Sequence, residues 1–351
     1  MAEIFYQDQS GTLYTGDSVS ILKNLPQNSV DMVVTSPPYW SLRNYKDESR
    51  QLGQERLFKD YIYNLCNYLG ATWDILKDNG SLWVNIGDTY YGSNKGAGGT
   101  GVKSKKQTTN KGSYWNKGNK GAQLNNSKDF KNNELPRKSL CMIPARFCIE
   151  MQDRGWVLRN QIIWHKPNAM PNPASDRFSV DYEVIFFFTK LVKSYKFNQQ
   201  LEPYTTPLAR WGGEKLVADG VSIWDGGTGQ SSYRDRKLRP NPEGRNKRSV
   251  WAINTKAKQG LTHFATYPEK LIVSPILAGS NEGDVVLDPF FGSGTTGVVA
   301  ERLGRKWIGI ELSKEYCAEA IARVTSSRED KDAKPKIRNK NMDERRTTQA
   351  V

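Results

Sequence analysis

The sequence predicts an α/β fold in which buried strands alternate with helices along most of the chain. Short apolar runs at 30–34, 184–188 and 284–288 have the length and composition of buried strands. Segments such as 58–76 carry apolar residues at helical spacing. A glycine-rich turn follows the run 284–288 and leads into another helical pattern, which is typical of doubly wound sheets.

These patterns predict seven strands and six helices. The strands are expected at 13–17, 30–34, 80–88, 156–167, 184–188, 284–288 and 307–311, and the helices at 18–25, 58–76, 144–154, 270–277, 292–303 and 313–324. Asp17 or Ser18 is expected to cap the first helix. Thr266 and Glu269 form a capping-box pattern before the fourth helix, with Pro268 in its first turn.

Changes in composition divide the chain into four parts. Residues 1–170 and 255–325 are predicted to be the two halves of one α/β domain, and 171–254, which lacks clean alternation, is interpreted as an inserted recognition region. Within the first half, 91–131 holds nine lysines, eight glycines and a single acid, which predicts a mobile loop. Residues 326–351 are dense in mixed charge and predict a disordered tail.

The formal net charge is +14 and the pI is about 9.4. Such a charge favours a polyanionic partner, a generic solubility charge being the alternative. The lysine-rich segment 91–131 also contains Tyr114 and Trp115, whose rings offer stacking surfaces for bases. The tail 326–351 holds eight bases and five acids, so most of the excess charge lies elsewhere in the chain.

Membrane, secreted and metal-binding classes fit the sequence poorly. No apolar stretch approaches the ~20 residues that a membrane span needs, and residues 1–8 lack a signal-peptide pattern, so we expect a cytoplasmic protein. The four cysteines form no CxxC pair and there are only two histidines, so no metal site is expected. Cys66, Cys141, Cys148 and Cys317 are expected to be buried thiols.

The most informative motif is Ser36-Pro37-Pro38-Tyr39, directly after the apolar run 30–34. Two prolines fix φ and remove two backbone donors, and the residue before each proline is restricted to extended geometry. The motif therefore presents a hydroxyl, a free carbonyl and an aromatic ring on a stiff edge. This set suits a site that grips the amino group of a flat base, whereas the alternative is a proline turn with an incidental tyrosine.

The second motif runs from Asp288 to Gly297, where a strand ends in an acid and a glycine turn opens a helix. Glu311 ends the next strand, and an acid in that position suits a ribose diol. The glycine pattern alone also fits a dinucleotide dehydrogenase. Asp288 would repel a pyrophosphate, however, so the turn suits a cationic cofactor with an amino group, such as S-adenosylmethionine.

With these motifs the chain resembles the DNA amino-methyltransferases, which methylate an exocyclic nitrogen of a base. The matching stretches are 35–40, 264–271 and 288–296, and Gly16-Asp17 also fits. The catalytic motif precedes the cofactor motif, which resembles the permuted order of the beta group. The resemblance implies a Rossmann-like sheet of seven strands with helices on both faces and S-adenosylmethionine bound across the strand ends.

The resemblance also implies roles for individual residues. The hydroxyl of Ser36 and the carbonyl of Pro37 would accept the two amine hydrogens and free the lone pair for in-line attack on the methyl group. Tyr39 would stack on a base flipped out of the duplex. The catalytic residues implied are Ser36, Pro37, Pro38 and Tyr39, and the cofactor-binding residues implied are Asp17, Phe264, Thr266, Asp288, Pro289, Phe290, Gly292, Gly294, Thr295 and Glu311.

Double-stranded DNA is the expected partner. Arg43 and Tyr45 are candidates for the phosphate beside the flipped base. Asn85, Asp88 and Lys166 lie at the ends of strands that should flank the pocket. They are candidates for contact with the base or a phosphate, with turn formation as the alternative role. Further candidate DNA contacts are the basic residues bunched in the recognition region: Arg234, Arg236, Lys237, Arg239, Arg245, Lys247 and Arg248.

Serine at the first motif position resembles the cytosine N4 enzymes, whereas adenine N6 enzymes more often carry aspartate there, so we favour cytosine N4 and keep adenine N6 as the alternative. Cytosine C5 methylation needs a thiol nucleophile, which in the family of C5 enzymes follows a proline, and none of the four cysteines here follows one. Three further classes stay open: a nicotinamide-dependent dehydrogenase, a methyltransferase acting on RNA or protein, and a non-enzymatic DNA-binding protein. The sequence also leaves open a cognate restriction endonuclease and the choice between monomer and homodimer.

Overall fold

The computed structural model of the chain describes residues 3–40, 51–91, 135–136, 138–172, 174–204, 241, 243–255 and 267–332. Its centre is a sheet of nine strands in the order β1-β2-β11-β10-β3-β4-β6-β5-β9. The strands are β1 (Glu3–Gln7), β2 (Gly11–Thr15), β3 (Val30–Thr35), β4 (Leu76–Ile86), β5 (Val157–His165), β6 (Tyr182–Thr189), β9 (Val250–Ala252), β10 (Val285–Asp288) and β11 (Lys306–Glu311). The sheet is mostly parallel, and β1 and β6 run against their neighbours.

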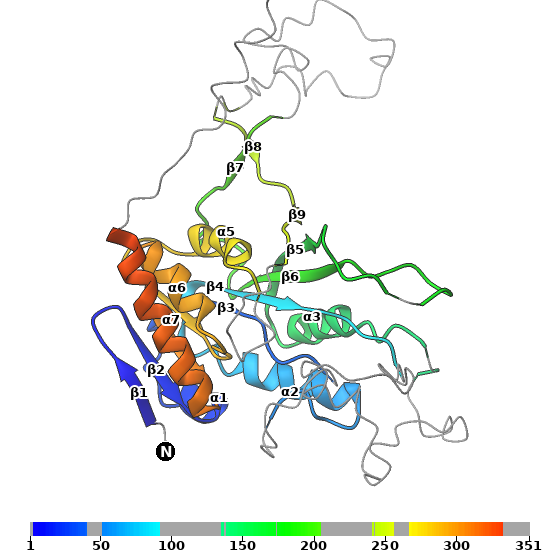
Figure 1. Cartoon of the computed structure of the whole chain (residues 1–351), viewed down its shortest axis with the longest axis horizontal. Coiled ribbons are helices and arrows are strands. Elements are labelled where there is room, and N and C mark those ends of the chain that lie inside the picture. Colours follow the sequence, from blue (N-terminus) through cyan, green and yellow to red (C-terminus); the bar gives the residue numbers. More distant parts are fainter. Residues whose placement is uncertain are drawn as a thin grey trace, which may run out of the picture.

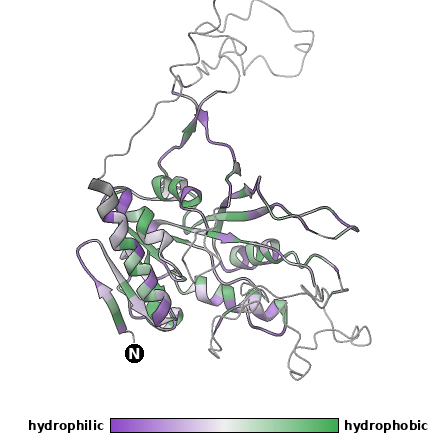
Figure 2. Ribbon diagram, in the orientation of Figure 1, coloured by the Kyte–Doolittle hydropathy of each residue, from purple (hydrophilic) through white to green (hydrophobic). Residues whose placement is uncertain are grey.

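Helices cover both faces of this sheet. They are α1 (Ser18–Leu22), α2 (Phe58–Gly70), α3 (Ile143–Asp153), α5 (Glu269–Gly279), α6 (Thr295–Arg302) and α7 (Lys314–Asp332). Successive strand residues point to opposite faces, so Val33 packs with α1, α2 and α3, whereas Val34 packs with α5, α6 and α7. Figure 2 shows β6 as an almost continuous hydrophobic ribbon, as expected for a strand buried on both faces.

The position of β10 beside β3 determines where a ligand can bind. From β10 the chain passes through α6 to β11 on one side, and from β3 it passes through α2 to β4 on the other side. The sheet order therefore reverses between β10 and β3, and such switch points leave a crevice outside the carboxyl ends of the strands. The two motifs at 36–39 and 288–297 both begin at this edge.

The expectation of an α/β fold is confirmed, but the expected number of strands was too small. The seven predicted strands are the seven central ones, and β1 and β9 add one strand at each edge. The predicted helix 58–76 is too long, because α2 ends at Gly70 and Leu76 already begins β4. At the other end of the chain α7 continues to Asp332, so the prediction of disorder is wrong for 326–332, and 333–351 lie outside the described residues.

Two further expectations need correction. The helix α5 begins at Glu269 with Pro268 as its N-cap residue and no side-chain cap, so the capping-box register that we predicted is wrong. The region 171–254 does not stand wholly apart from the core, because it contributes β6 and β9 to the central sheet. Outside that sheet, the region forms most of the connection between β5 and β6. It also forms the small antiparallel pair β7 (Leu201–Glu202) and β8 (Arg245–Asn246), which Figure 1 shows above the main body.

Three simpler expectations concern cysteines, metals and membranes. All four cysteines are buried and unpaired, as predicted, and burial raises the pKa of the Cys66 thiol to about 12. Within the described ranges, no cluster of His, Cys, Asp and Glu is suited to a metal ion. No helix in the same ranges is long and apolar enough to cross a membrane.

Candidate active site

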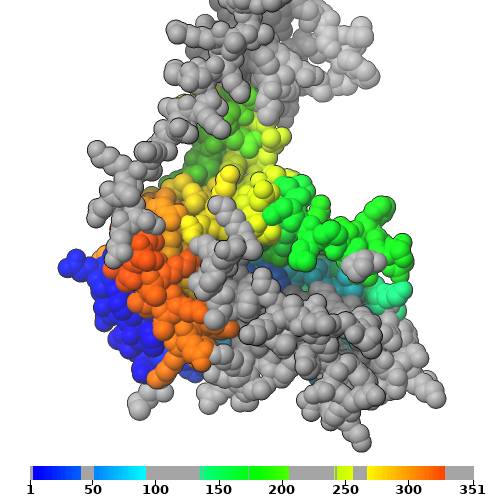
Figure 3. Space-filling view, in the orientation of Figure 1, coloured from blue at the N-terminus to red at the C-terminus, as the bar shows by residue number. Residues whose placement is uncertain are grey.

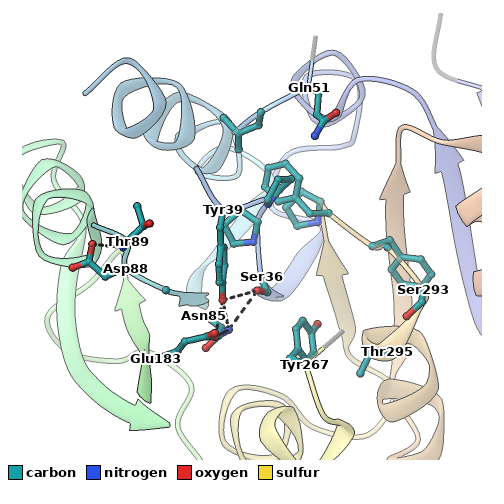
Figure 4. Close-up of a pocket in the computed structure, with 18 of the residues that line it drawn as sticks. Ser36, Tyr39, Gln51, Asn85, Asp88, Thr89, Glu183, Tyr267, Ser293 and Thr295 are labelled. Atoms are coloured by element: carbon teal, nitrogen blue, oxygen red, sulfur yellow. Dashed lines mark hydrogen bonds between the residues drawn. The ribbon is translucent and has the colours of Figure 1, made fainter. Parts of the chain in front are cut away.

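A cavity of about 710 Å³ opens at the carboxyl edge of the central strands. The turn after β3 lines one wall, and the turns after β10 and β11 line another. Figure 4 shows Ser36, Tyr39, Asn85 and Glu183 gathered on one side, across the cavity from Ser293 and Thr295. The volume lies within the range of about 300–1,000 Å³ that small-molecule sites occupy.

A hydrogen-bonded network holds the Ser36–Tyr39 turn. The Tyr39 hydroxyl donates to Glu183 Oε2 at 2.7 Å, and Asn85 Nδ2 lies 2.9 Å from the same hydroxyl and 2.8 Å from the same carboxylate oxygen. Ser36 Oγ lies at the edge of the network, 3.4 Å from both the Tyr39 hydroxyl and Asn85 Nδ2. Burial and the Glu183 carboxylate raise the pKa of Tyr39 well above 10, so the ring stays neutral.

Glu183 is the centre of this network, and the sequence interpretation missed it. Its other carboxylate oxygen pairs with Lys166, whose ammonium also lies 4.5 Å from the Trp164 ring centroid. Asn85 and Lys166, both predicted candidates for base or phosphate contact, line the cavity. The available signal for Glu183 was a lone acid at the start of the apolar run 184–188.

Backbone geometry sets the position of the Tyr39 ring. A Cβ atom at Gly87 would lie 2.8 Å from Tyr39 Cε2, so only glycine leaves room for the ring there. The carbonyl of Pro38 accepts a hydrogen bond from the Tyr61 hydroxyl at 2.9 Å, which ties the turn to α2. The turn is therefore held from β4, β6 and α2 together.

The glycine turn after β10 adopts conformations that other residues rarely reach. Gly292 has φ 53° and Gly294, the N-cap residue of α6, has φ 76°. The Gly292 amide donates to Glu311 Oε2 at 2.9 Å, and the Ser313 amide donates to Glu311 Oε1 at 2.9 Å. Burial nevertheless raises the pKa of Glu311 to about 7.

Asp288 differs from its expected place. It is only 1% exposed and does not line the cavity. Its carboxylate accepts hydrogen bonds from Thr35 and Thr296 at 2.6 Å each, from the Phe290 amide at 3.0 Å and from Tyr267 at 3.2 Å. Burial raises its pKa. Asp288 therefore joins β3, β10 and α6 behind the cavity wall, and Gly294 also lies behind that wall.

Asp17 lines the cavity but already has partners. Its carboxylate caps α1 by accepting from the Ser20 amide at 2.9 Å, and it accepts from the Tyr68 hydroxyl at 3.1 Å. Tyr68 in turn packs against Phe290, with ring centroids 5.8 Å apart. These contacts place an acid and two aromatic rings on the same side of the cavity.

Arg323 braces the glycine turn, and no local sequence pattern predicted it. Its guanidinium donates to the Ser293 carbonyl at 3.1 Å, to Ser293 Oγ at 3.0 Å and to Thr295 Oγ1 at 2.8 Å, and it pairs with Glu269 at 2.8 Å. The site thus depends on a side chain of α7 that does not itself line the cavity.

Apart from Asn85, Asp288 and Gly294, which are placed above, the predicted site residues divide into three groups. Those that line the cavity are Asp17, Ser36, Pro37, Pro38, Tyr39, Asp88, Lys166, Pro289, Phe290, Gly292, Thr295 and Glu311. Arg245, Lys247 and Arg248 lie near β8, away from the cavity, and both arginines pair with Glu202. Those outside the described residues are Arg43, Tyr45, Tyr114, Trp115, Arg234, Arg236, Lys237, Arg239, Phe264 and Thr266, together with 92–134.

Comparison with known proteins now decides the family. The model of a family described as DNA methylase, covering N6 and N4 methyltransferases, matches residues 30–322. The chain belongs to this family. It is 37% identical over 316 residues to the type II methyltransferase M.XycI of Xanthomonas campestris pv. cyanopsidis (90% of this chain, 88% of the relative) and 36% identical over 313 residues to M.Cfr9I of Citrobacter freundii (89% and 87%).

Solved structures share the fold of this methyltransferase. PvuII DNA methyltransferase (cytosine-N4-specific) matches with a TM-score of 0.56 at 20% identity, over 93% of this chain and 94% of that one. A Thermus thermophilus protein solved with S-adenosyl-L-methionine matches with a TM-score of 0.51 at 22% identity, over 90% and 93%. The resemblance drawn from the motifs is confirmed.

The protein is therefore a DNA methyltransferase of the N4/N6 family, of the type II restriction–modification kind, and its methyl donor is S-adenosylmethionine. DNA is its substrate. This conclusion removes the nicotinamide-dependent dehydrogenase and the non-enzymatic DNA-binding protein from consideration. The cavity fits the cofactor, because the Glu311 carboxylate, a hydrogen-bond acceptor suited to ribose hydroxyls, is held in place by two amides and lines the same cavity as Phe290.

Proposed function

We propose that this methyltransferase methylates the exocyclic N4 of a cytosine that is flipped out of double-stranded DNA. The observation that carries the proposal is that the Ser36–Tyr39 turn and the Phe290–Thr295 turn line a single cavity at the ends of neighbouring strands. A base inside a duplex does not reach such a recess, so it must leave the stack. The same argument holds for adenine N6, which is the alternative.

The proposed chemistry begins with the amine. The lone pair of an exocyclic amine is delocalised into the ring, which makes the nitrogen a poor nucleophile. The Ser36 hydroxyl and the Pro37 carbonyl accept hydrogen bonds from the two N–H groups of the amine and draw the nitrogen toward tetrahedral geometry. The neighbouring Pro38 carbonyl already accepts from Tyr61, which supports giving this role to Pro37. Tyr39 stacks on the base and keeps its orientation.

The cofactor, when bound, supplies an electrophilic methyl group. We assign the ribose hydroxyls to Glu311, and the methionine part to Pro289, Phe290, Gly292 and Thr295, which line the cavity. Asp17 is assigned to the adenine, because its Oδ1 accepts from Tyr68 and retains acceptor capacity. Asp288 and Gly294 lie behind the wall, so we now assign them to shaping the turn rather than to cofactor contact.

The choice of cytosine has two supports. The motif begins with serine, and the PvuII enzyme that shares the fold is described as cytosine-N4-specific. The experiment is to methylate plasmid DNA with the purified protein, digest it to nucleosides and analyse these by mass spectrometry. N4-methylcytosine is expected, and N6-methyladenine without N4-methylcytosine would refute the choice. Ser36→Ala should lower product formation roughly 100-fold or more while cofactor binding persists.

Target recognition is assigned to the part of 171–254 that lies outside the central sheet, and the lysine-rich residues 91–131 are a candidate for a further contact with DNA. Of the basic residues predicted to contact DNA, Lys166 is the one described cation that lines the cavity, so it is the favoured phosphate contact. A cognate restriction endonuclease is proposed from the relatives' type II naming. Sequencing of methylated plasmid for modified positions would identify the target site and test this assignment with variants of Lys166.

A further inference from the structure

The connection between β5 and β6 carries the two most exposed large hydrophobic side chains in the described part of the chain. Met170 is 90% exposed and Phe178 is 97% exposed. Figure 1 shows this hairpin as a long arm extending from the sheet, and Figure 3 shows it standing out at the surface. Hydrophobic groups that gather on an exposed surface mark an interaction site more often than a single exposed side chain does.

The arm is anchored on both sides of Phe178. Before it, Asp176 pairs with Lys138 at 2.6 Å, and the Arg177 guanidinium lies 3.6 Å from the centroid of the Tyr90 ring. After it, His165 Nε2 lies 3.4 Å from a carboxylate oxygen of Asp181, and the Asp181 carbonyl accepts from the Lys166 amide at 2.7 Å. These contacts hold the segment in place, so Phe178 is presented to solvent by an ordered support.

The same arm forms part of the rim of the active-site cavity. Met170, Arg177, Val180 and Tyr182 line that cavity, and Val180 and Tyr182 are themselves 41% and 44% exposed. Phe178 lies two residues before Val180 and four before Tyr182, in the segment that leads into β6. Exposed hydrophobic side chains therefore lie both on the cavity rim, at Val180 and Tyr182, and two residues further along the arm at Phe178, next to the cation of Arg177 in the chain.

We propose that Phe178 inserts into the DNA duplex and fills the space that the target base leaves when it enters the cavity. The inference rests on the base flipping proposed above. DNA is the occupant because the substrate must cross this rim to bring a base to Ser36. Apolar side chains, phenylalanine and methionine among them, insert between base steps in several classes of DNA-binding protein. Lys166 and Arg177 supply positive charge near the phosphates at the same rim.

The test compares two DNA duplexes after the methylation site has been mapped. One duplex contains the normal site, and in the other the target base faces an abasic position, so that it is unpaired before binding. Phe178→Ala should lower kcat/KM on the normal duplex about 10- to 100-fold, the range of one lost aromatic stacking contact. On the duplex with the abasic position the variant should lie within about threefold of the unaltered protein, because less stacking and pairing is lost there.

Control variants make the outcomes distinguishable. Phe178→Trp should keep activity on the normal duplex, and Phe5→Ala, an exposed aromatic side chain on the edge strand β1, should leave activity unchanged. Cofactor affinity of Phe178→Ala should match that of the unaltered protein. Normal activity of Phe178→Ala on the paired site, or an equal loss on both duplexes, would overturn the inference. If the unaltered protein methylates neither duplex, it is the proposed function that fails.

Discussion

Thr35 donates a hydrogen bond of 2.6 Å to Asp288, although the two residues are 253 positions apart in the sequence. Both side chains are buried, at 1% exposure each. The bond joins the end of β3, which leads into Ser36, to the end of β10, which leads into Phe290. The Ser36–Tyr39 turn and the Phe290–Thr295 turn, to which we assign the base and the cofactor, are thereby held in a fixed relation to each other.

Replacing Thr35 with valine should therefore affect cofactor binding as well as stability. The change removes one donor and leaves a buried carboxylate oxygen short of a partner, which costs about 1–3 kcal/mol of unfolding free energy. We also expect S-adenosylmethionine to bind about tenfold more weakly, because Asp288 holds the Phe290 amide. Thr189→Val is the matched control, since its buried hydroxyl donates to Leu191 on the chain after β6, away from Asp288. Equal cofactor affinity of the two variants, measured by calorimetry, would contradict this role.

The two functions assigned to Tyr39 can be separated. Tyr39→Phe keeps the ring but loses the hydrogen bond to Glu183, so we expect a loss in kcat/KM of less than about tenfold. Tyr39→Ala also removes the stacking surface, and the loss should reach about 100-fold. Steady-state kinetics on DNA of the mapped site checks the order. A larger effect for Tyr39→Phe than for Tyr39→Ala is incompatible with stacking.

Glu183→Gln keeps the size of the side chain and removes its charge. Lys166 then loses its ion pair, and Asn85 and Tyr39 lose a charged acceptor. We expect kcat on DNA to fall about tenfold while cofactor affinity stays unchanged, because Glu183 lies beside Ser36 and Tyr39, on the side of the cavity to which we assign the base. Glu202→Gln also removes an acid from ion pairs, here with Arg245 and Arg248, but Glu202 lies away from the cavity, so the change should leave kcat unchanged. Unaltered kcat in Glu183→Gln would show that the network is dispensable.

Glu311 should make cofactor binding depend on pH. Burial raises its pKa from 4.5 to about 7, so the folded protein without cofactor retains a proton that the unfolded chain releases between these values. Stability from this group is therefore greatest at low pH and is lost as the pH rises toward about 7. Ribose hydroxyls donate to the ionised carboxylate, so binding should release a proton and affinity should increase with pH up to about 7.

Calorimetry in buffers with different ionisation heats measures that proton release. Glu311→Gln should bind the cofactor more weakly and without the pH dependence, because glutamine does not titrate. Affinity that is independent of pH in the unaltered protein would remove Glu311 from the ribose site.

DNA binding should weaken steeply with salt. A chain with a net charge of +14 that contacts phosphates releases counterions, and the logarithm of its DNA affinity should fall by about 0.9 for each contacted phosphate per tenfold increase in salt. If Lys166 contacts a DNA phosphate, Lys166→Gln should lower the magnitude of this slope by about 0.9, the contribution of one phosphate. Titration of a labelled duplex at several salt concentrations checks both, and a flat response would argue against phosphate contacts at the cavity.

Local patterns predicted the strands and helices of the core well. The seven central strands are buried apolar runs, and the glycines at 292 and 294 have the positive φ angles that their turn needs. The edge strands β1 and β9 escaped prediction because a half-exposed edge carries a weak apolar pattern: Val250 on β9 is 64% exposed. The final helix α7 extends past its predicted end and includes residues 326–332, although these residues carry mixed charge and few apolar side chains.

The sequence by itself determined the fold class, the two motifs and the kind of reaction, since these depend on residue types at short spacing. Only the tertiary structure decided which distant side chains meet them. Glu183 reaches Tyr39 from 144 positions away and Arg323 reaches Ser293 from 30, and both contacts depend on strand order and helix packing. Asp288 lies at the predicted strand end, yet its carboxylate is enclosed by four hydrogen-bond donors from β3, α6 and the neighbouring chain. Local spacing carries no information about such partners, because they are brought together by burial of the sheet's two faces.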